Sequence, residues 1–105
     1  MAQWDVHLNP VTKARDQIPY LVVVQSDLLD TLPTRLVAPL SRSVVSAPSL
    51  PRRLAPQFLV AGERLVLKPH EAGMLPARSL GGAVTSLRGE AHRIIDALDA
   101  VVSGV

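Results

Sequence analysis

The sequence predicts a mainly β protein with one C-terminal α-helix, arranged as a compact antiparallel sheet. Short apolar runs rich in β-branched residues recur before the glycine pair at 81–82, and such runs favour strands. One of them, "FLVAGERLVL", has two apolar halves around a glycine, which is typical of a β-hairpin. After the glycine pair the apolar period changes to that of a helix.

The first two candidate strands lie near the N-terminus. Residues 4–8 alternate, with three apolar side chains on one side and Asp5 and His7 on the other. The polar residues 12–17 indicate a loop. Residues 20–24 form an almost continuous apolar run, which predicts a strand buried on both faces.

The middle of the chain contains further strands and one irregular stretch. Residues 35–40 are a third candidate strand, in which Pro39 predicts either an edge position or the end of the strand. Residues 41–56 contain three prolines, which exclude a long helix and a central strand. The hairpin of "FLVAGERLVL" follows, and residues 74–80 are expected to add another strand.

The C-terminal segment has the spacing of one helix face. Gly89 lies within it and predicts a break or a restart there. Ile95 and Val102 widen the apolar face, so the helix is expected to cover its own sheet and a second copy in a homodimer. A helix face used only for the chain's own core is the alternative. The apolar positions are Val84, Leu87, Ala91, Ile94, Leu98, Val101 and Val105.

Composition excludes several classes of protein. A chain of 105 residues is expected to form a single domain, residues 1–105. It has no cysteine, and its three histidines lack metal-ligand spacing, so no metal or cofactor is expected. A net charge of +2 is too small to predict direct nucleic-acid binding. No apolar run is long enough to cross a membrane and no signal-peptide pattern is present, so we expect a soluble cytoplasmic protein.

The charges are distributed unevenly. The basic residues between positions 35 and 68 face a single acid, Glu63, whereas the residues from Glu90 onward are mainly acidic. A basic middle segment favours an acidic partner, although a solvated surface explains it equally well. The basic residues of this segment are Arg35, Arg42, Arg52, Arg53, Arg64 and Lys68.

The stretch "VVVQSDLLDT" raises the question of an enzyme. Asp27 and Asp30 would act as an acid and base pair only if their environments separated their pKa values. Asp and Ser are also favoured where a strand gives way to a turn, because their side chains bond nearby backbone amides. We therefore interpret Ser26, Asp27 and Asp30 as turn residues. The G-x-S-x-G and phosphate-binding glycine motifs are absent, so a binding module is favoured over an enzyme.

Three segments together resemble the CcdB family, the toxin half of a bacterial toxin–antitoxin pair. These segments are "QSDLLDT", "RLVAPL" and the closing helix "IIDALDAVVSGV", and the family pattern continues without gaps from Val22 onward. The loop at residues 8–19 is a few residues longer than in the family pattern. The resemblance implies a fold related to SH3-like barrels, a homodimer, and binding of the A subunit of DNA gyrase with trapping of the gyrase–DNA cleavage complex.

The resemblance also implies binding residues and a second partner. A CcdA-type antitoxin with a disordered, acidic C-terminal segment would neutralise the toxin, and the basic residues Arg42, Arg52 and Arg53 would receive that segment. At least one of the two adjacent leucines is expected to be exposed. The matching gyrase-facing positions are Leu28, Leu29, Asp99, Val102, Ser103, Gly104 and Val105.

One position departs from the family. Well-known members end in Trp-Gly-Ile, whereas this chain has Ser103 in place of the tryptophan. Loss of that ring removes about 2–4 kcal/mol of interface energy. A non-toxic homologue that binds only an antitoxin is therefore one alternative. An RNA-cleaving toxin similar to MazF and Kid is another, with Arg35 and Asp30, or His70 and Arg78, as the candidate groups.

Overall fold

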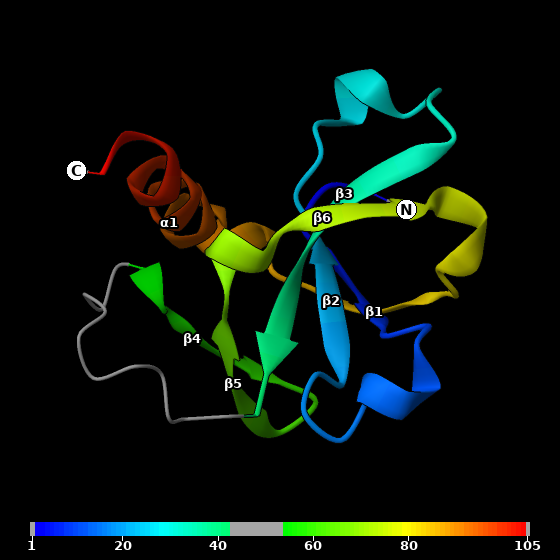
Figure 1. The fold of residues 1–105 in the computed structure, drawn as a ribbon, viewed down its shortest axis with the longest axis horizontal. Helices are drawn as coiled ribbons and strands as arrows, with labels where there is room; N and C mark the ends of the chain where they lie inside the picture. The colour runs from blue at the N-terminus through cyan, green and yellow to red at the C-terminus, as the bar shows by residue number, and fades with distance from the viewer. Residues whose placement is uncertain (1, 43–53, 105) are drawn as a thin grey trace.

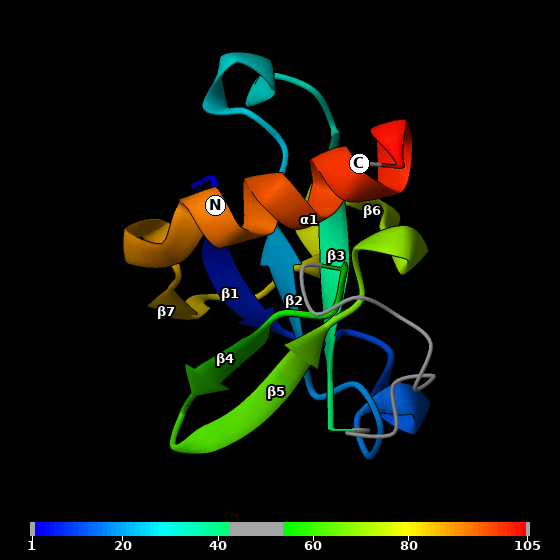
Figure 2. The ribbon, with the colours of Figure 1, turned by 90° about the vertical axis from the view of Figure 1, so that its left-hand side faces the viewer.

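The computed structural model describes residues 2–42 and 54–104 as a curled antiparallel sheet with one helix lying across it (Figures 1 and 2). The strand order is β4-β5-β3-β2-β1-β7, and β6 pairs with the part of β3 that β5 does not reach. The predicted fold class is therefore confirmed. The elements are β1 (Asp5–Leu8), β2 (Tyr20–Val23), β3 (Thr34–Ser41), β4 (Gln57–Val60), β5 (Glu63–Leu67), β6 (Gly73–Pro76), β7 (Ala83–Ser86) and α1 (Ala91–Ser103).

The continuous apolar run at residues 20–24 forms β2 because this strand is covered on both faces. Val22 belongs to the main core, which also contains Ile94 and Ala97 of α1. Leu21 and Val23 point to the opposite face, into a second apolar cluster. The prediction of a strand buried on both faces is confirmed.

The alternation predicted for residues 4–8 is wrong at its second half. His7 is buried and Leu8 is 42% exposed. The cause is β7, which pairs with β1 through an irregularity between Val6 and His7. The imidazole Nδ1 lies 2.8 Å from the carbonyl oxygen of Gly81, which accepts a hydrogen bond from the Nδ1–H. The imidazole therefore links β1 to the segment before β7, a tertiary contact that the local pattern did not contain.

Pro39 lies inside a central strand, which corrects the expectation of an edge or a strand end. It pairs with Leu21 of β2 on one side. On the other side, β3 pairs with β6 as far as Val37 and with β5 from Leu40 onward, so Pro39 falls where the neighbouring strand changes. A residue without an N–H is tolerated there because that place in the ladder needs no donor.

The predicted hairpin and helix are both present, but their boundaries in the structure differ from the predicted ones. The β4–β5 turn uses Ala61 and Gly62, both with positive φ, as a type I′ hairpin turn requires. The residues after the glycine pair at 81–82 form β7 rather than helix, and Val84 is exposed on it. α1 begins only after the short 3-10 turn at Arg88–Glu90, consistent with the break predicted at Gly89.

α1 buries one face and leaves apolar side chains on another. Ile94, Ala97 and Ala100 are buried, whereas Ile95 and Val102 are 45% and 88% exposed. None of the helices in the described segments is long and apolar enough to cross a membrane. Most of the irregular stretch predicted at residues 41–56, including Leu50, lies outside the described residues, and Leu54 is half-buried.

Candidate functional site

The connection between β2 and β3 projects two leucines from the sheet. It contains the 3-10 turn η2 (Asp27–Leu29), and we call residues 25–33 the η2 loop. Leu28 is 92% exposed and Leu29 is 47% exposed. The expectation that at least one of them is exposed is confirmed. Leu32 of the same loop is 45% exposed, so three exposed leucines lie within nine residues. A group of exposed apolar side chains, unlike a single one, favours contact with a partner.

Polar side chains shape the start of this loop. The Ser26 Oγ accepts a hydrogen bond from the backbone N–H of Leu28 at 3.1 Å, which caps η2. The Asp27 carboxylate accepts one from the backbone N–H of Gln3 at 2.8 Å. Ser26 and Asp27 therefore act as turn residues, as interpreted from the sequence.

The side chains of Gln25 and Arg35 hold the loop against β3 by hydrogen bonds. Gln25 donates to the carbonyl oxygens of Leu29 and Thr34 at 3.1 and 3.2 Å. Its own amide oxygen accepts from the N–H of Leu36 at 2.9 Å. Arg35, only 8% exposed, donates to two carbonyl oxygens of the loop and to that of Thr34, the first residue of β3. Its acceptors are those of Asp30 at 2.8 Å, Leu32 at 2.6 Å and Thr34 at 2.9 Å.

The groups considered for RNA cleavage do not form a catalytic arrangement in the described residues. Arg35 contacts the backbone carbonyl of Asp30 rather than its carboxylate, and the guanidinium is used to hold the loop. His70 lies 3.5 Å from the carboxylate of Glu71, and no hydrogen bond or ion pair joins it to Arg78 within the described part of the chain. The sequence placed Arg35 near Asp30 correctly but did not reveal its structural use.

The second group of predicted gyrase-facing residues lies at the C-terminal end of α1. The Ser103 Oγ donates to the carbonyl oxygen of Asp99 at 2.7 Å, and Val102 is 88% exposed. Gly104 ends the helix with φ of 73°, and its N–H donates to Ala100. Val105 lies outside the described residues. Figures 1 and 2 draw this helix end and the η2 loop as separate projections on the same, upper side of the molecule.

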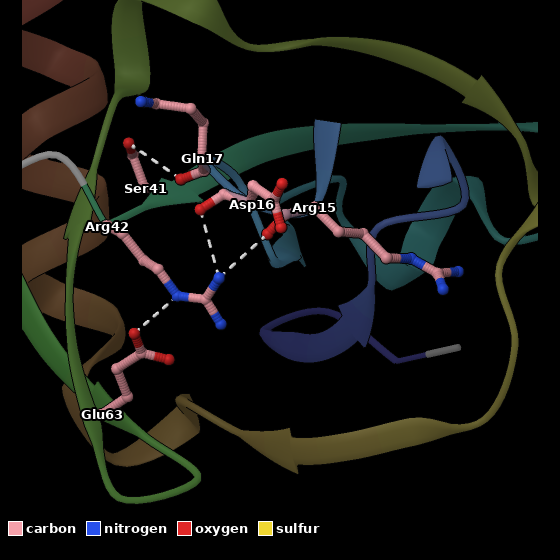
Figure 3. A network of polar contacts seen from close by, with 6 residues as sticks. All are labelled: Arg15, Asp16, Gln17, Ser41, Arg42 and Glu63. Carbon is pink, nitrogen blue, oxygen red and sulfur yellow. Dashed lines mark hydrogen bonds and ion pairs between the residues drawn. The ribbon is translucent and has the colours of Figure 1, made fainter. Parts of the chain in front are cut away.

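Of the predicted antitoxin-binding arginines, only Arg42 lies within the described residues. Its Nε is 2.6 Å from Oε2 of Glu63, and its Nη1 donates to the carbonyl oxygens of Arg15 and Asp16 (Figure 3). The hydrogen bond that Arg42 donates to the Glu63 carboxylate raises the pKa of Arg42 above its usual value. Arg52 and Arg53 lie outside the described residues.

A hollow between β4 and α1 was not predicted from the sequence. Its volume is about 810 Å³. Arg93 lies against it, with its guanidinium carbon 4.5 Å from the centre of the Phe58 ring and with hydrogen bonds to Glu90 and to the carbonyl oxygen of Gln57. Acids and bases are both present in its lining, so it does not favour a ligand of one charge. The lining residues are Ala55, Pro56, Gln57, Phe58, Leu59, Arg64, Glu90, Arg93 and Asp96.

The described segments contain no group of three or more His, Cys, Asp or Glu side chains able to hold a metal ion. What the site does offer is an exposed apolar projection on a firmly held loop, an exposed helix end, and an arginine paired with a single carboxylate. Protein–protein interfaces commonly bury exposed apolar side chains and arginine.

Comparisons with known proteins identify a family and similar folds. A family model described as CcdB protein matches residues 3–104. Among solved structures, Mycobacterium tuberculosis toxin MazF-mt6 superposes with a TM-score of 0.73 at 13% identity, covering 94% of this chain and 96% of that one. A structure described as an Mtb toxin gives a TM-score of 0.65 at 13% identity, with 78% and 90% covered. A search of curated proteins finds no significant match.

Proposed function

Because the chain belongs to the CcdB family, it is a toxin of a toxin–antitoxin system, and we propose that its target is the A subunit of DNA gyrase. In this proposal the protein acts by binding rather than by catalysis. It traps gyrase on cleaved DNA and thereby arrests the cell. Neither a cofactor nor a metal takes part.

The observation that carries the proposal is the exposure of Leu28 on a loop that does not depend on Leu28 for its shape. Gln25, Ser26 and Arg35 hold the loop backbone by hydrogen bonds, so the leucine side chain is free to enter a partner's pocket. A side chain presented on a fixed backbone loses little conformational freedom on binding. Leu28 and Leu29 form the first contact region in the proposal. Asp99, Val102, Ser103, Gly104 and Val105 form the second.

The decisive experiment measures gyrase-mediated DNA cleavage with the full chain and matched variants. We expect the wild-type protein to accumulate cleaved plasmid DNA and to bind the purified gyrase A subunit. Leu28→Asp should abolish both effects, because a charge replaces the apolar contact. Leu59→Asp is the control, since Leu59 is 63% exposed on β4, outside the proposed surface. Absence of binding and of cleaved DNA at tens of micromolar protein would refute the proposed target.

Ser103 decides between a toxin and a non-toxic homologue. Its side chain is exposed and bonds back to the helix, so a larger ring at this position meets solvent rather than core. Ser103→Trp should strengthen gyrase binding about 30-fold or more if the ring restores a binding hot spot. Growth arrest that appears only in this variant would identify a binding scaffold without toxicity of its own.

Two partners complete the proposal. The first is a second copy of the chain, supported by the exposed apolar side chains of Ile95 and Val101 on α1. Ile95→Asp should convert the dimer to a monomer in light scattering.

The second partner is a CcdA-type antitoxin, whose acidic, disordered C-terminal segment binds Arg42, Arg52 and Arg53. Co-expression of a neighbouring antitoxin gene should relieve growth arrest.

RNA cleavage is the alternative activity. The fold is shared with a structure named as a MazF toxin, but a likeness at 13% identity concerns the fold alone. Incubation with a defined RNA separates the two activities. Sequence-specific cuts that disappear in Arg35→Lys, with folding intact, would favour an enzyme and displace the binding proposal.

A further inference from the structure

We propose that Glu63 occupies, on Arg42, the place that a carboxylate of an acidic partner takes, so that binding exchanges one carboxylate for another. This inference rests on the proposed antitoxin and adds a residue, Glu63, that limits access to its site. Glu63 is the single acid among the basic residues between positions 35 and 68. It makes the charged contact of Arg42 in the described structure.

The Arg42 guanidinium is held in position independently of Glu63. The backbone N–H of Arg42 donates to the carbonyl oxygen of Gln17 at 2.8 Å. Its Nη1 donates to the carbonyl oxygens of Arg15 at 3.2 Å and Asp16 at 3.1 Å (Figure 3). These acceptors belong to the backbone of one short loop. Release of Glu63 therefore leaves Arg42 pointing in the same direction.

The edge of the guanidinium that faces Glu63 is only half used. Glu63 receives a hydrogen bond from Nε, at 2.6 Å, through a single oxygen. The adjacent Nη2 makes no hydrogen bond to any residue in the described part of the chain. Nε and Nη2 together match the two oxygens of one carboxylate, and such paired hydrogen bonds are stronger than a single one. An incoming carboxylate thus gains a contact that Glu63 lacks.

Because the ion pair between Arg42 and Glu63 is exposed, little free energy is lost when it breaks. The side chains of Arg42 and Glu63 are 45% and 39% exposed, so solvent screens their attraction. An isolated surface pair of this kind is readily replaced by a ligand that brings several carboxylates at once. A disordered acidic peptide is such a ligand, since its neighbouring acids raise the local carboxylate concentration. Asp16 is the remaining acid that acts electrostatically on Arg42.

The test uses poly-L-glutamate as the probe and measures its affinity for the full chain by fluorescence anisotropy. Glu63→Gln should tighten binding about two- to fivefold, because the competing charge is removed while the side chain keeps its size. Glu71→Gln is the matched control. It removes the same charge from another exposed glutamate, one that lies beside Lys68 and His70, and should have a smaller effect.

A second background tests whether the effect acts through Arg42. In Arg42→Gln the gain from Glu63→Gln should disappear, and in Arg42→Lys it should be reduced, because lysine lacks the paired donors. Circular dichroism checks that each variant is folded. An equal gain in Glu71→Gln, a gain that persists without Arg42, or no binding by any variant would overturn the exchange. Gyrase cleavage is measured separately, so failure of the proposed target leaves this result unaffected.

Discussion

Removal of the Arg35 guanidinium should destabilise the fold, because this side chain holds the η2 loop. Its three hydrogen bonds reach the carbonyl oxygens of Asp30, Leu32 and Thr34 at 2.6–2.9 Å, and the side chain is almost completely buried. A hydrogen bond from a charged donor contributes about 1.5–3 kcal/mol. Two of the three share Nη1, so their contributions overlap. We expect Arg35→Met to lower the free energy of unfolding by about 2–4 kcal/mol.

Urea unfolding gives the measurement. Trp4 is the only tryptophan and is 7% exposed, so its fluorescence reports the loss of the core. The protein concentration is kept fixed, since a dimer makes stability depend on it. Arg88→Met is the control at an exposed arginine and should change stability by less than about 0.5 kcal/mol. An equally small change in Arg35→Met would refute the structural role and return Arg35 to the list of catalytic candidates.

Three further changes test the loop, the hairpin and the core. Gln25→Ala should cost about 1–3 kcal/mol and accelerate amide exchange in the η2 loop, since three backbone partners are lost; unchanged exchange would contradict this. Gly62→Ala should cost about 1–2 kcal/mol in thermal unfolding because φ is +80°, whereas Gly89→Ala, without positive φ, should not destabilise. Ile94→Ala should cost about 2–5 kcal/mol in urea unfolding, far more than Val84→Ala at an exposed position.

Much of the fold followed from local pattern, and the errors occurred where distant segments meet. β2, the β4–β5 hairpin and α1 were predicted because side-chain direction along a strand or helix repeats at a fixed period. β7 was taken for helix, since its few apolar residues also fit the helical spacing. His7 was expected on the polar side and is buried, because pairing with β7 brings Gly81 over it.

The candidate site divides in the same way. The sequence by itself determined that "QSDLLDT" is a turn with two apolar side chains and that the chain resembles the CcdB family, because these depend on residues adjacent in the chain. The tertiary structure decided that Leu28 is exposed, that Arg35 holds the loop and that Arg42 pairs with Glu63, 21 residues away. Burial and the partner of a charged group depend on which distant segments the fold brings together.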